Sequence, residues 1–440
     1  MNKNPFESLD REILGESGIS GDVEKNLFSL CDDIGPRFAG TEGYREAAEF
    51  MLEKFKRYGF DQAELEPFEF TAWRRGEAAT FSLWLPEKKA FPCYELPYSA
   101  STGPEGIARG LVDIGAGAKE DLKSVGDGLK GCLALVTKPG GHRMDIYARC
   151  VKQGAAGFIW GNTVPGMMLA SGSVTEAEPG KIPAISIPLE SVYQIQRVLK
   201  NGAEACQFHV QTDSRVETGT TWNVVAELPG NAFPDEWVII GGHLDSHEIG
   251  PGAYDNGAGA VMVLETARLL IRIREHLQRS VRFILFAGEE VGLIGSHYHA
   301  KAHADDMKKA RFMLNCDMPS LGRPRGIAFH ECPKGADYLK SLETQMETEI
   351  VCQNRGHCHS DHYPFILQGV PTAGVGGGPL GPKIQSFYHM AADTPEKISI
   401  TDLRDCAAFA ARFLLRTAND ECWPDMRRTK EEINTFGSGK

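Results

Sequence analysis

The feature that most constrains the fold of this 440-residue chain is a strand–loop–helix pattern that repeats from Asn223 onward. Two helical stretches, residues 259–275 and 294–309, separate short apolar runs that are typical of buried strands. There are four such runs, at residues 237–240, 281–286, 312–314 and 372–375. Alternation of this kind predicts an α/β fold, with a mostly parallel central sheet flanked by helices.

The first 214 residues divide into two kinds of pattern. Near the start, Tyr44, Ala47, Met51 and Phe55 repeat at helical spacing, and a strand-like alternation follows at residues 63–70. From residue 88, apolar runs alternate with glycine-rich turns, and helical patterns occur only near residues 144–153 and 189–199. We predict a discontinuous main domain, residues 1–87 and 215–440, and a β-rich α/β domain inserted at residues 88–214.

Chemically reactive side chains follow each of the four predicted strands. In sheets of this type, ligands bind beyond the carboxyl ends of the strands. One further acidic residue precedes the helix between the first two strands. The residues concerned are His243 and Asp245, then Asp255, then Glu289 and Glu290, then Asp317, and finally His389.

These residue types suit divalent cations. Imidazole and carboxylate groups bind zinc, cobalt or manganese. His243, Asp255, Glu290, Asp317 and His389 are too many ligands for one tetrahedral zinc, but they suit two ions that share a bridging carboxylate. Each residue alone has an ordinary structural explanation, such as a turn or helix cap at Asp255. Their common position at the strand ends favours a metal site.

Six segments carry a resemblance to a known family. They read GGHLDS, GAYDNGAGA, FAGEEVGLIGS, NCDMPS, SDHYPFILQGVPTAGV and FYHMAADT. In order and spacing, residues 20–85 and 215–415 resemble the M28 family of di-zinc aminopeptidases, which have the zinc exopeptidase fold. The inserted region resembles a protease-associated domain. The resemblance implies two Zn²⁺ ions, with Co²⁺ or Mn²⁺ as alternatives.

The same resemblance implies a role for each residue. Asp255 would bridge the two ions, Glu290 and His389 would complete one ligand shell, and His243 and Asp317 would complete the other. Two more residues would take part in catalysis: Glu289 as the general base toward the attacking water, and Asp245 as the carboxylate that orients His243. The peptide bond between Asp255 and Asn256 would be cis.

Three residues are candidates for substrate contact, namely His362, Tyr363 and Tyr388. In the family that this chain resembles, the stretch at residues 360–362 borders the substrate pocket. The segment 357–362 contains three histidines, but their spacing is too dense for one metal ion unless the backbone folds back sharply. We interpret it as a polar loop at the rim of the site.

The predicted function is that of a metal-dependent exopeptidase acting on peptides or dipeptides, and an aminopeptidase is favoured. A dipeptidase or carboxypeptidase of the plasma glutamate carboxypeptidase type is an alternative, and so is a glutaminyl cyclase. Some relatives keep the fold as receptors or scaffolds without a working site. That reading requires the loss of ligands, and every expected ligand position is filled here.

Composition limits the binding partners and the cellular location that we expect for the chain. A formal net charge of -12 argues against nucleic-acid binding. The chain has no run of roughly 20 apolar residues, so we expect no membrane span. The N-terminus lacks the pattern of a secretory signal. Together with eleven cysteines without paired spacing, this predicts free thiols and a cytoplasmic protein. From the resemblance we expect a homodimer.

Overall fold

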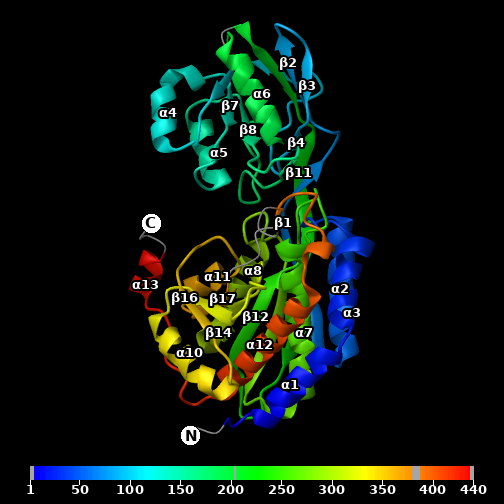
Figure 1. The fold of residues 1–440 in the computed structure, drawn as a ribbon, viewed down its shortest axis with the longest axis vertical. Helices are drawn as coiled ribbons and strands as arrows, with labels where there is room; N and C mark the ends of the chain where they lie inside the picture. Colours follow the sequence, from blue (N-terminus) through cyan, green and yellow to red (C-terminus); the bar gives the residue numbers. More distant parts are fainter. Residues whose placement is uncertain (1–3, 203–204, 379–386, 437–440) are drawn as a thin grey trace.

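A computed structural model describes residues 4–202, 205–378 and 387–436, and its main domain is built on an eight-stranded sheet (Figure 1). The strand order is β1-β11-β13-β12-β14-β17-β15-β16. The four adjacent strands β13, β12, β14 and β17 are parallel and contain the four predicted runs, so the predicted mostly parallel sheet is confirmed. The bounds are β1 Gln62–Arg75, β11 Ser214–Leu228, β12 Phe233–His243, β13 Arg279–Phe286, β14 Ala310–Asn315, β15 Arg325–Phe329, β16 Val351–Asn354 and β17 Thr372–Gly377.

Both faces of the central strands are apolar because helices cover both. Ile240 and Phe283 pack into the core on one face, whereas their neighbours Ile239 and Ile284 pack into the core on the other. The first face is covered by α1 Glu7–Ile19, α2 Asp22–Phe28, α3 Glu42–Tyr58, α7 Ala258–Arg272, α10 Pro333–Met346 and α12 Ile400–Asn419. The second face is covered by α8 Ile294–Ala302, α9 Ala304–Lys309 and α11 His362–Leu367, and a short helix, α13 Lys430–Thr435, comes near the C-terminus.

Two predicted helices of this domain can be compared directly with the structure. The pattern around Tyr44 and Phe55 is confirmed as α3, which Thr41 caps and which ends at Gly59 in the left-handed conformation. The predicted helix at residues 294–309 is two helices, α8 and α9, because the backbone at His303 leaves the helical conformation.

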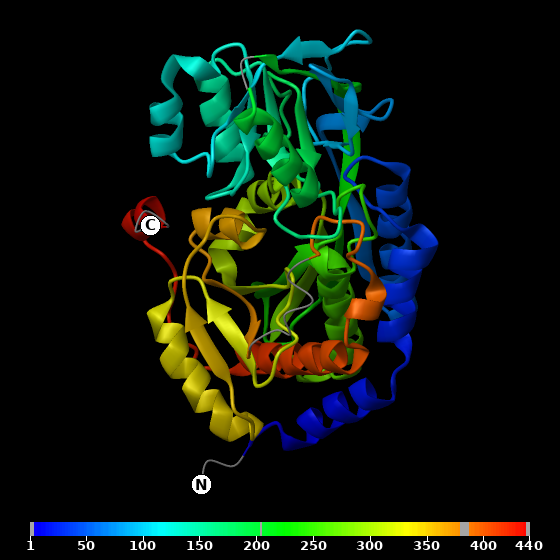
Figure 2. The same ribbon diagram turned by 45° about the horizontal axis from the view of Figure 1, so that its top comes forward.

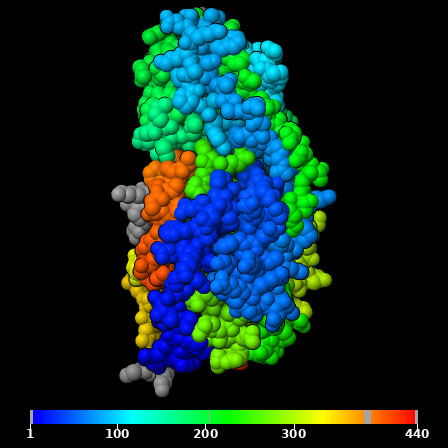
Figure 3. Space-filling model, turned by 90° about the vertical axis from the view of Figure 1, so that its right-hand side faces the viewer, coloured from blue at the N-terminus to red at the C-terminus, as the bar shows by residue number. Residues whose placement is uncertain are grey.

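In Figure 3, the N-terminal residues, in blue, form one side of the main domain.

A long antiparallel ribbon joins the main domain to the inserted region. β1 and β11 pair from Gln62 opposite Glu227 to Arg75 opposite Ser214, and the ribbon carries the inserted region at the top of Figure 1. That region contains a four-stranded sheet, β3-β2-β10-β5, and a five-stranded sheet, β4-β9-β8-β7-β6. Its strands are β2 Thr80–Leu85, β3 Lys89–Phe91, β4 Tyr94–Glu95, β5 Ile107–Arg109, β6 Leu111–Asp113, β7 Leu133–Val136, β8 Gly157–Gly161, β9 Ala184–Ile187 and β10 Gln207–Gln211.

Among its described residues, the inserted region also contains the α-helices α4 Lys119–Val125, α5 Arg143–Lys152 and α6 Leu189–Lys200. β2 pairs with β10 inside this region, although it lies before residue 88, where the sequence places the start of the insert. The apolar alternation of β2 does not differ from that of β1, so the pattern alone gives no boundary between them. The exact domain limits stay predictions.

Two further expectations concern the chain as a whole. All eleven cysteines are free thiols, as expected. Within the described residues, no helix is both long and apolar enough to cross a membrane.

Candidate metal centre

The predicted metal-binding residues meet at the carboxyl edge of the main sheet. β12 ends at His243, the loop after β13 carries Glu290, and Asp317 follows β14. Asp255 lies in the π-helical turn η4 Ala253–Gly257, and its peptide bond to Asn256 is cis, as predicted. The fifth residue, His389, has a backbone φ of 60°. A non-glycine residue in this strained conformation is typical of functional sites.

Buried polar side chains fix the loops of this edge. The Asn256 amide donates to the carbonyl oxygens of His243 and Cys316, at 3.2 and 2.8 Å, and so ties the ends of β12 and β14 together. The Asp393 carboxylate accepts hydrogen bonds from the backbone N–H groups of Tyr254 and Asp255, at 2.9 and 3.0 Å. The positions of the metal-binding side chains therefore depend on contacts far apart in sequence.

The fully buried side chain of Arg37 also fixes two loops at this edge of the sheet. The Arg37 guanidinium donates to the backbone carbonyls of Leu244, Pro251 and Gly252. These carbonyls flank the segments that carry His243 and Asp255. A guanidinium offers five N–H donors, so one side chain can fix several carbonyl groups at once.

Six side chains form two clusters that share one carboxylate. In the first cluster, His243 Nε2 lies 3.2 Å from Asp255 Oδ1 and 3.4 Å from Asp317 Oδ1. In the second, His389 Nε2 lies 3.1 Å from both Asp255 Oδ2 and Glu290 Oε2. The two oxygens of Asp255 thus face different clusters, which is the geometry of a bridging ligand.

His247 completes the second cluster and is absent from the sequence-based ligand set. Its Nε2 lies 2.8 Å from Glu290 Oε2, and its ring meets that of His389 edge-on, with 4.5 Å between centroids. The segment GGHLDSH carries a signal for it, because a second histidine follows His243 by four residues in the same strand-end loop. Periodicity alone does not show that the loop turns this side chain inward.

Unpaired ligand atoms test whether cations fit these residues. The buried atoms Glu290 Oε1 and Asp317 Oδ1 have no hydrogen-bond partner, and His243 Nε2 and His247 Nε2 approach carboxylate oxygens without the geometry of a hydrogen bond. Buried polar atoms in proteins nearly always have one. All four belong to the two clusters, and each offers a lone pair that a cation can accept. The residues therefore fit two divalent ions.

Several carboxylates lie close together in the centre, and their negative charges shift the pKa values of neighbouring groups. Burial lowers the pKa of His243 and His389, but neighbouring carboxylates outweigh it and raise the pKa of His389 to about 10 and that of His243 well above its usual range. Burial of the Glu289 carboxyl, together with the nearby charges of Asp317 and Glu290, raises its pKa well above the ordinary value. Buried carboxylates at this density need cations to compensate them.

Asp245 lies beside His243, where the resemblance expects a carboxylate that orients this histidine. His243 Nδ1 lies 3.1 Å from the backbone oxygen of Asp245 and 3.6 Å from its carboxylate. The carboxylate also accepts hydrogen bonds from the backbone N–H groups of Glu289 and Glu290, both at 3.2 Å. Asp245 therefore links His243 to the loop that carries the two glutamates.

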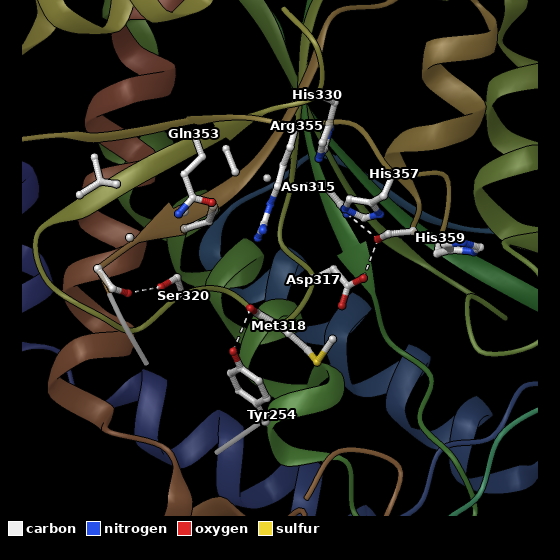
Figure 4. A pocket seen from close by; sticks show the side chains of 18 of the residues that line it. Tyr254, Asn315, Asp317, Met318, Ser320, His330, Gln353, Arg355, His357 and His359 are labelled. Atoms are coloured by element: carbon white, nitrogen blue, oxygen red, sulfur yellow. Dashed lines mark hydrogen bonds between the residues drawn. The ribbon is translucent and has the colours of Figure 1, made fainter. Parts of the chain in front are cut away.

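Two cavities open beside the centre and share part of their walls. The smaller, of about 240 Å³, is lined by Glu289, Glu290 and His389 of the main domain and by Arg143 of the insert. The larger, of about 1050 Å³, is lined by Asp317 and also by His330, Gln353 and Arg355 (Figure 4). Their common lining residues are Asp317, Met318, His359 and Tyr388. Arg143 thus makes the inserted region part of the wall of the smaller cavity, and Figure 2 shows this region above the main domain.

Of the three substrate candidates, only Tyr388 lines these cavities among the described residues. His362 is fully buried and stacks on His330, with 3.6 Å between ring centroids, and its Nε2 lies 2.8 Å from the His357 backbone oxygen. Tyr363 stacks on Phe436, outside both cavities. Both side chains therefore pack against other aromatic rings of the protein and do not line either cavity.

Comparisons with known proteins agree with this geometry. Residues 223–414 match the model of peptidase family M28. The chain is 25% identical to carboxypeptidase Q of Bos taurus, over 89% of this chain and 87% of that protein, and 26% identical to a probable leucine aminopeptidase 2 of Aspergillus fumigatus, over 81% and 74%. A crystal structure of a peptidase M28 precursor from Shewanella amazonensis superimposes with a TM-score of 0.83 at 25% identity, covering 96% and 99% of the two chains.

Proposed function

We propose that this chain, whose residues 223–414 match the model of peptidase family M28, is a zinc-dependent exopeptidase that removes the amino-terminal residue of peptides. The observation that carries the proposal is the pair of clusters joined by Asp255, each with unpaired buried atoms. Three histidines and three carboxylates are a donor set that suits zinc. His243, Asp255 and Asp317 would hold one ion, and His247, Glu290 and His389, together with Asp255, would hold the other.

Two zinc ions in this centre would polarise the scissile carbonyl group and make water a nucleophile near neutral pH. Glu289 is placed to take a proton from the attacking water and to pass it to the leaving amine. Its backbone is fixed by the Asp245 carboxylate, and its half-buried side chain lines the smaller cavity. A raised pKa suits this double role, because the group must accept a proton and then release it.

The preference for an amino terminus rests on charge near the centre. Asp145 of the insert contributes a carboxylate to the wall of the smaller cavity, beside the Arg143 guanidinium, and this carboxylate is neither a metal ligand nor the general base of the proposal. A free α-ammonium group is attracted to such a site, whereas a blocked amine is not. The probable leucine aminopeptidase 2 of Aspergillus fumigatus is a relative with the corresponding activity in its name.

Arg355 favours a second candidate function, that of a carboxypeptidase or dipeptidase. Its side chain extends into the larger cavity toward Asp317 (Figure 4). A guanidinium binds a carboxylate through two parallel hydrogen bonds, so this position suits the free carboxyl end of a short peptide. Carboxypeptidase Q, the relative with the corresponding name, aligns with this chain over most of both lengths.

Blocking each end of one peptide separates these functions. We expect the enzyme to cleave a dipeptide, a tripeptide and an amino-acid amide, and to lose activity when the amine is acetylated. Retained activity on the acetylated peptide, together with loss on the carboxyl-amidated one, would instead establish a carboxypeptidase. Loss of activity when either the amine or the carboxyl group is blocked would indicate a dipeptidase. In that case Arg355→Gln should raise KM for the unblocked dipeptide.

Two remaining alternatives are tested in the same assay. A glutaminyl cyclase would release pyroglutamate rather than a free amino acid. A receptor-like homologue would release nothing, and a preparation without zinc would support that reading.

A further inference from the structure

A short segment of the insert, Ala170–Val174, lies directly against the proposed metal centre. All five residues are buried. Ala170 forms a β-bridge with Met390, the residue after His389, so the insert and the main domain are joined beside that histidine. The segment is thus part of the wall of the centre although it belongs to the inserted region.

Hydrogen bonds from this segment reach all three residues that belong only to the second cluster. The Ser171 backbone N–H donates to the His389 backbone oxygen at 2.8 Å, and the Ser171 hydroxyl lies 3.3 Å from His247 Nδ1. The Ser173 hydroxyl donates to the Glu290 backbone oxygen at 2.7 Å. Ser171 and Ser173 are 2% and 0% exposed, so water does not compete for these bonds.

The first cluster is supported differently, by the main domain itself. His243 Nδ1 faces the Asp245 backbone oxygen at 3.1 Å. Asp317 Oδ2 accepts a 2.6 Å hydrogen bond from the Ser360 hydroxyl, which in turn accepts one from the Asn315 amide. Each of these partners comes from the main domain, so the two clusters differ in which domain supports them.

We propose that Ser171 and Ser173 of the insert are positioning residues for the ion at His247, Glu290 and His389. This ion would then require the docked insert, whereas the ion at His243 and Asp317 would not. The inference rests on the proposed function, because it assumes the two-ion centre described above.

The chemistry of a histidine ligand explains the role of Ser171. A histidine that binds a metal through Nε2 carries its proton on Nδ1, and the partner of that proton fixes the tautomer and the ring orientation. In His247, the Ser171 oxygen is the acceptor within reach of Nδ1. Loss of this partner would leave a buried N–H group unpaired and the ring free to turn.

The segment is itself held in place by the start of α5. Arg143 Nε donates to the Ser173 backbone oxygen at 3.0 Å. The φ of Gly172 is +142°, a conformation that favours glycine, and a Cβ atom there would also displace the Arg143 guanidinium, which would lie 1.9 Å away. The two hydroxyl groups are therefore presented by a rigid element rather than by a free loop.

Metal affinities of single variants test this inference. The wild type and Ser171→Ala and Ser173→Ala would be loaded with zinc and titrated with a competing chelator, and metal content would be measured by mass spectrometry. We expect one of the two ions to bind about 10- to 100-fold more weakly in each variant, and the other to be unchanged. Absorption spectra of the cobalt-loaded proteins should show the altered geometry at one site only.

Ser99→Ala is the matched control, because Ser99 is a buried serine of the insert whose hydroxyl bonds to residues of that region. It should keep both affinities. Unchanged affinities in both serine variants, or equal weakening of both ions, would overturn the inference. A wild type that binds fewer than two ions would instead refute the proposed centre, so the two failures are distinguishable.

Discussion

Replacing Glu289 by glutamine tests the proposed chemistry most directly. Glutamine keeps the size of the side chain, and the hydrogen bond that fixes this position comes from the backbone N–H group to Asp245, so the substitution should leave the loop in place. The amide cannot accept a proton. Only the transfer of a proton from water to the leaving amine should be lost.

The expected loss follows from the value of general acid–base help. A positioned base contributes about 10²- to 10⁴-fold, which corresponds to about 3–5 kcal/mol in the activation free energy. The loss should appear in kcat, with KM little changed, because the substrate contacts remain. Glu289 is not among the residues of the two clusters, so both zinc ions should stay bound.

The assay combines steady-state hydrolysis of a chromogenic amino-acid amide with metal analysis of the same preparation. Glu176→Gln provides the matched control, because Glu176 lines the same cavity from the insert and has no proposed role in proton transfer. Its kcat should stay near the wild-type value. A Glu289→Gln enzyme with two ions and a kcat within tenfold of wild type would refute the assignment.

Three further predictions concern the ligands and stability. His247→Ala should lower the affinity for one of the two ions and leave the other bound, and loss of neither ion in a chelator titration would remove His247 from the centre. Asp255→Asn should weaken both ions, since each carboxylate oxygen faces one cluster; selective loss of a single ion would contradict bridging. Burial holds the pKa of His299 at about 4, whereas the unfolded chain takes up this proton near pH 6.5. The free energy of unfolding should therefore fall by up to about 3 kcal/mol as pH drops through this window, and denaturant titrations should show a flatter pH profile for His299→Asn.

The sequence was sufficient for the central sheet and for most of the centre. The apolar runs at β12, β13, β14 and β17 are short and bounded by turns, so their burial follows from local pattern. Parallel strands bring their carboxyl ends to one edge, and so residues that follow each strand must converge there. This is why His243 and Glu290 could be expected to lie at one edge of the sheet before any contact was known.

Tertiary contacts decided what no local pattern records. His247 reaches the second cluster only because its loop, held by Arg37, turns inward beside Glu290. Ser171 reaches the centre across the chain from the insert. Periodicity reports which face of a strand or helix is buried, but it does not report which distant segment packs against a loop. The conformation of such loops is set by hydrogen bonds between residues that the sequence places far apart.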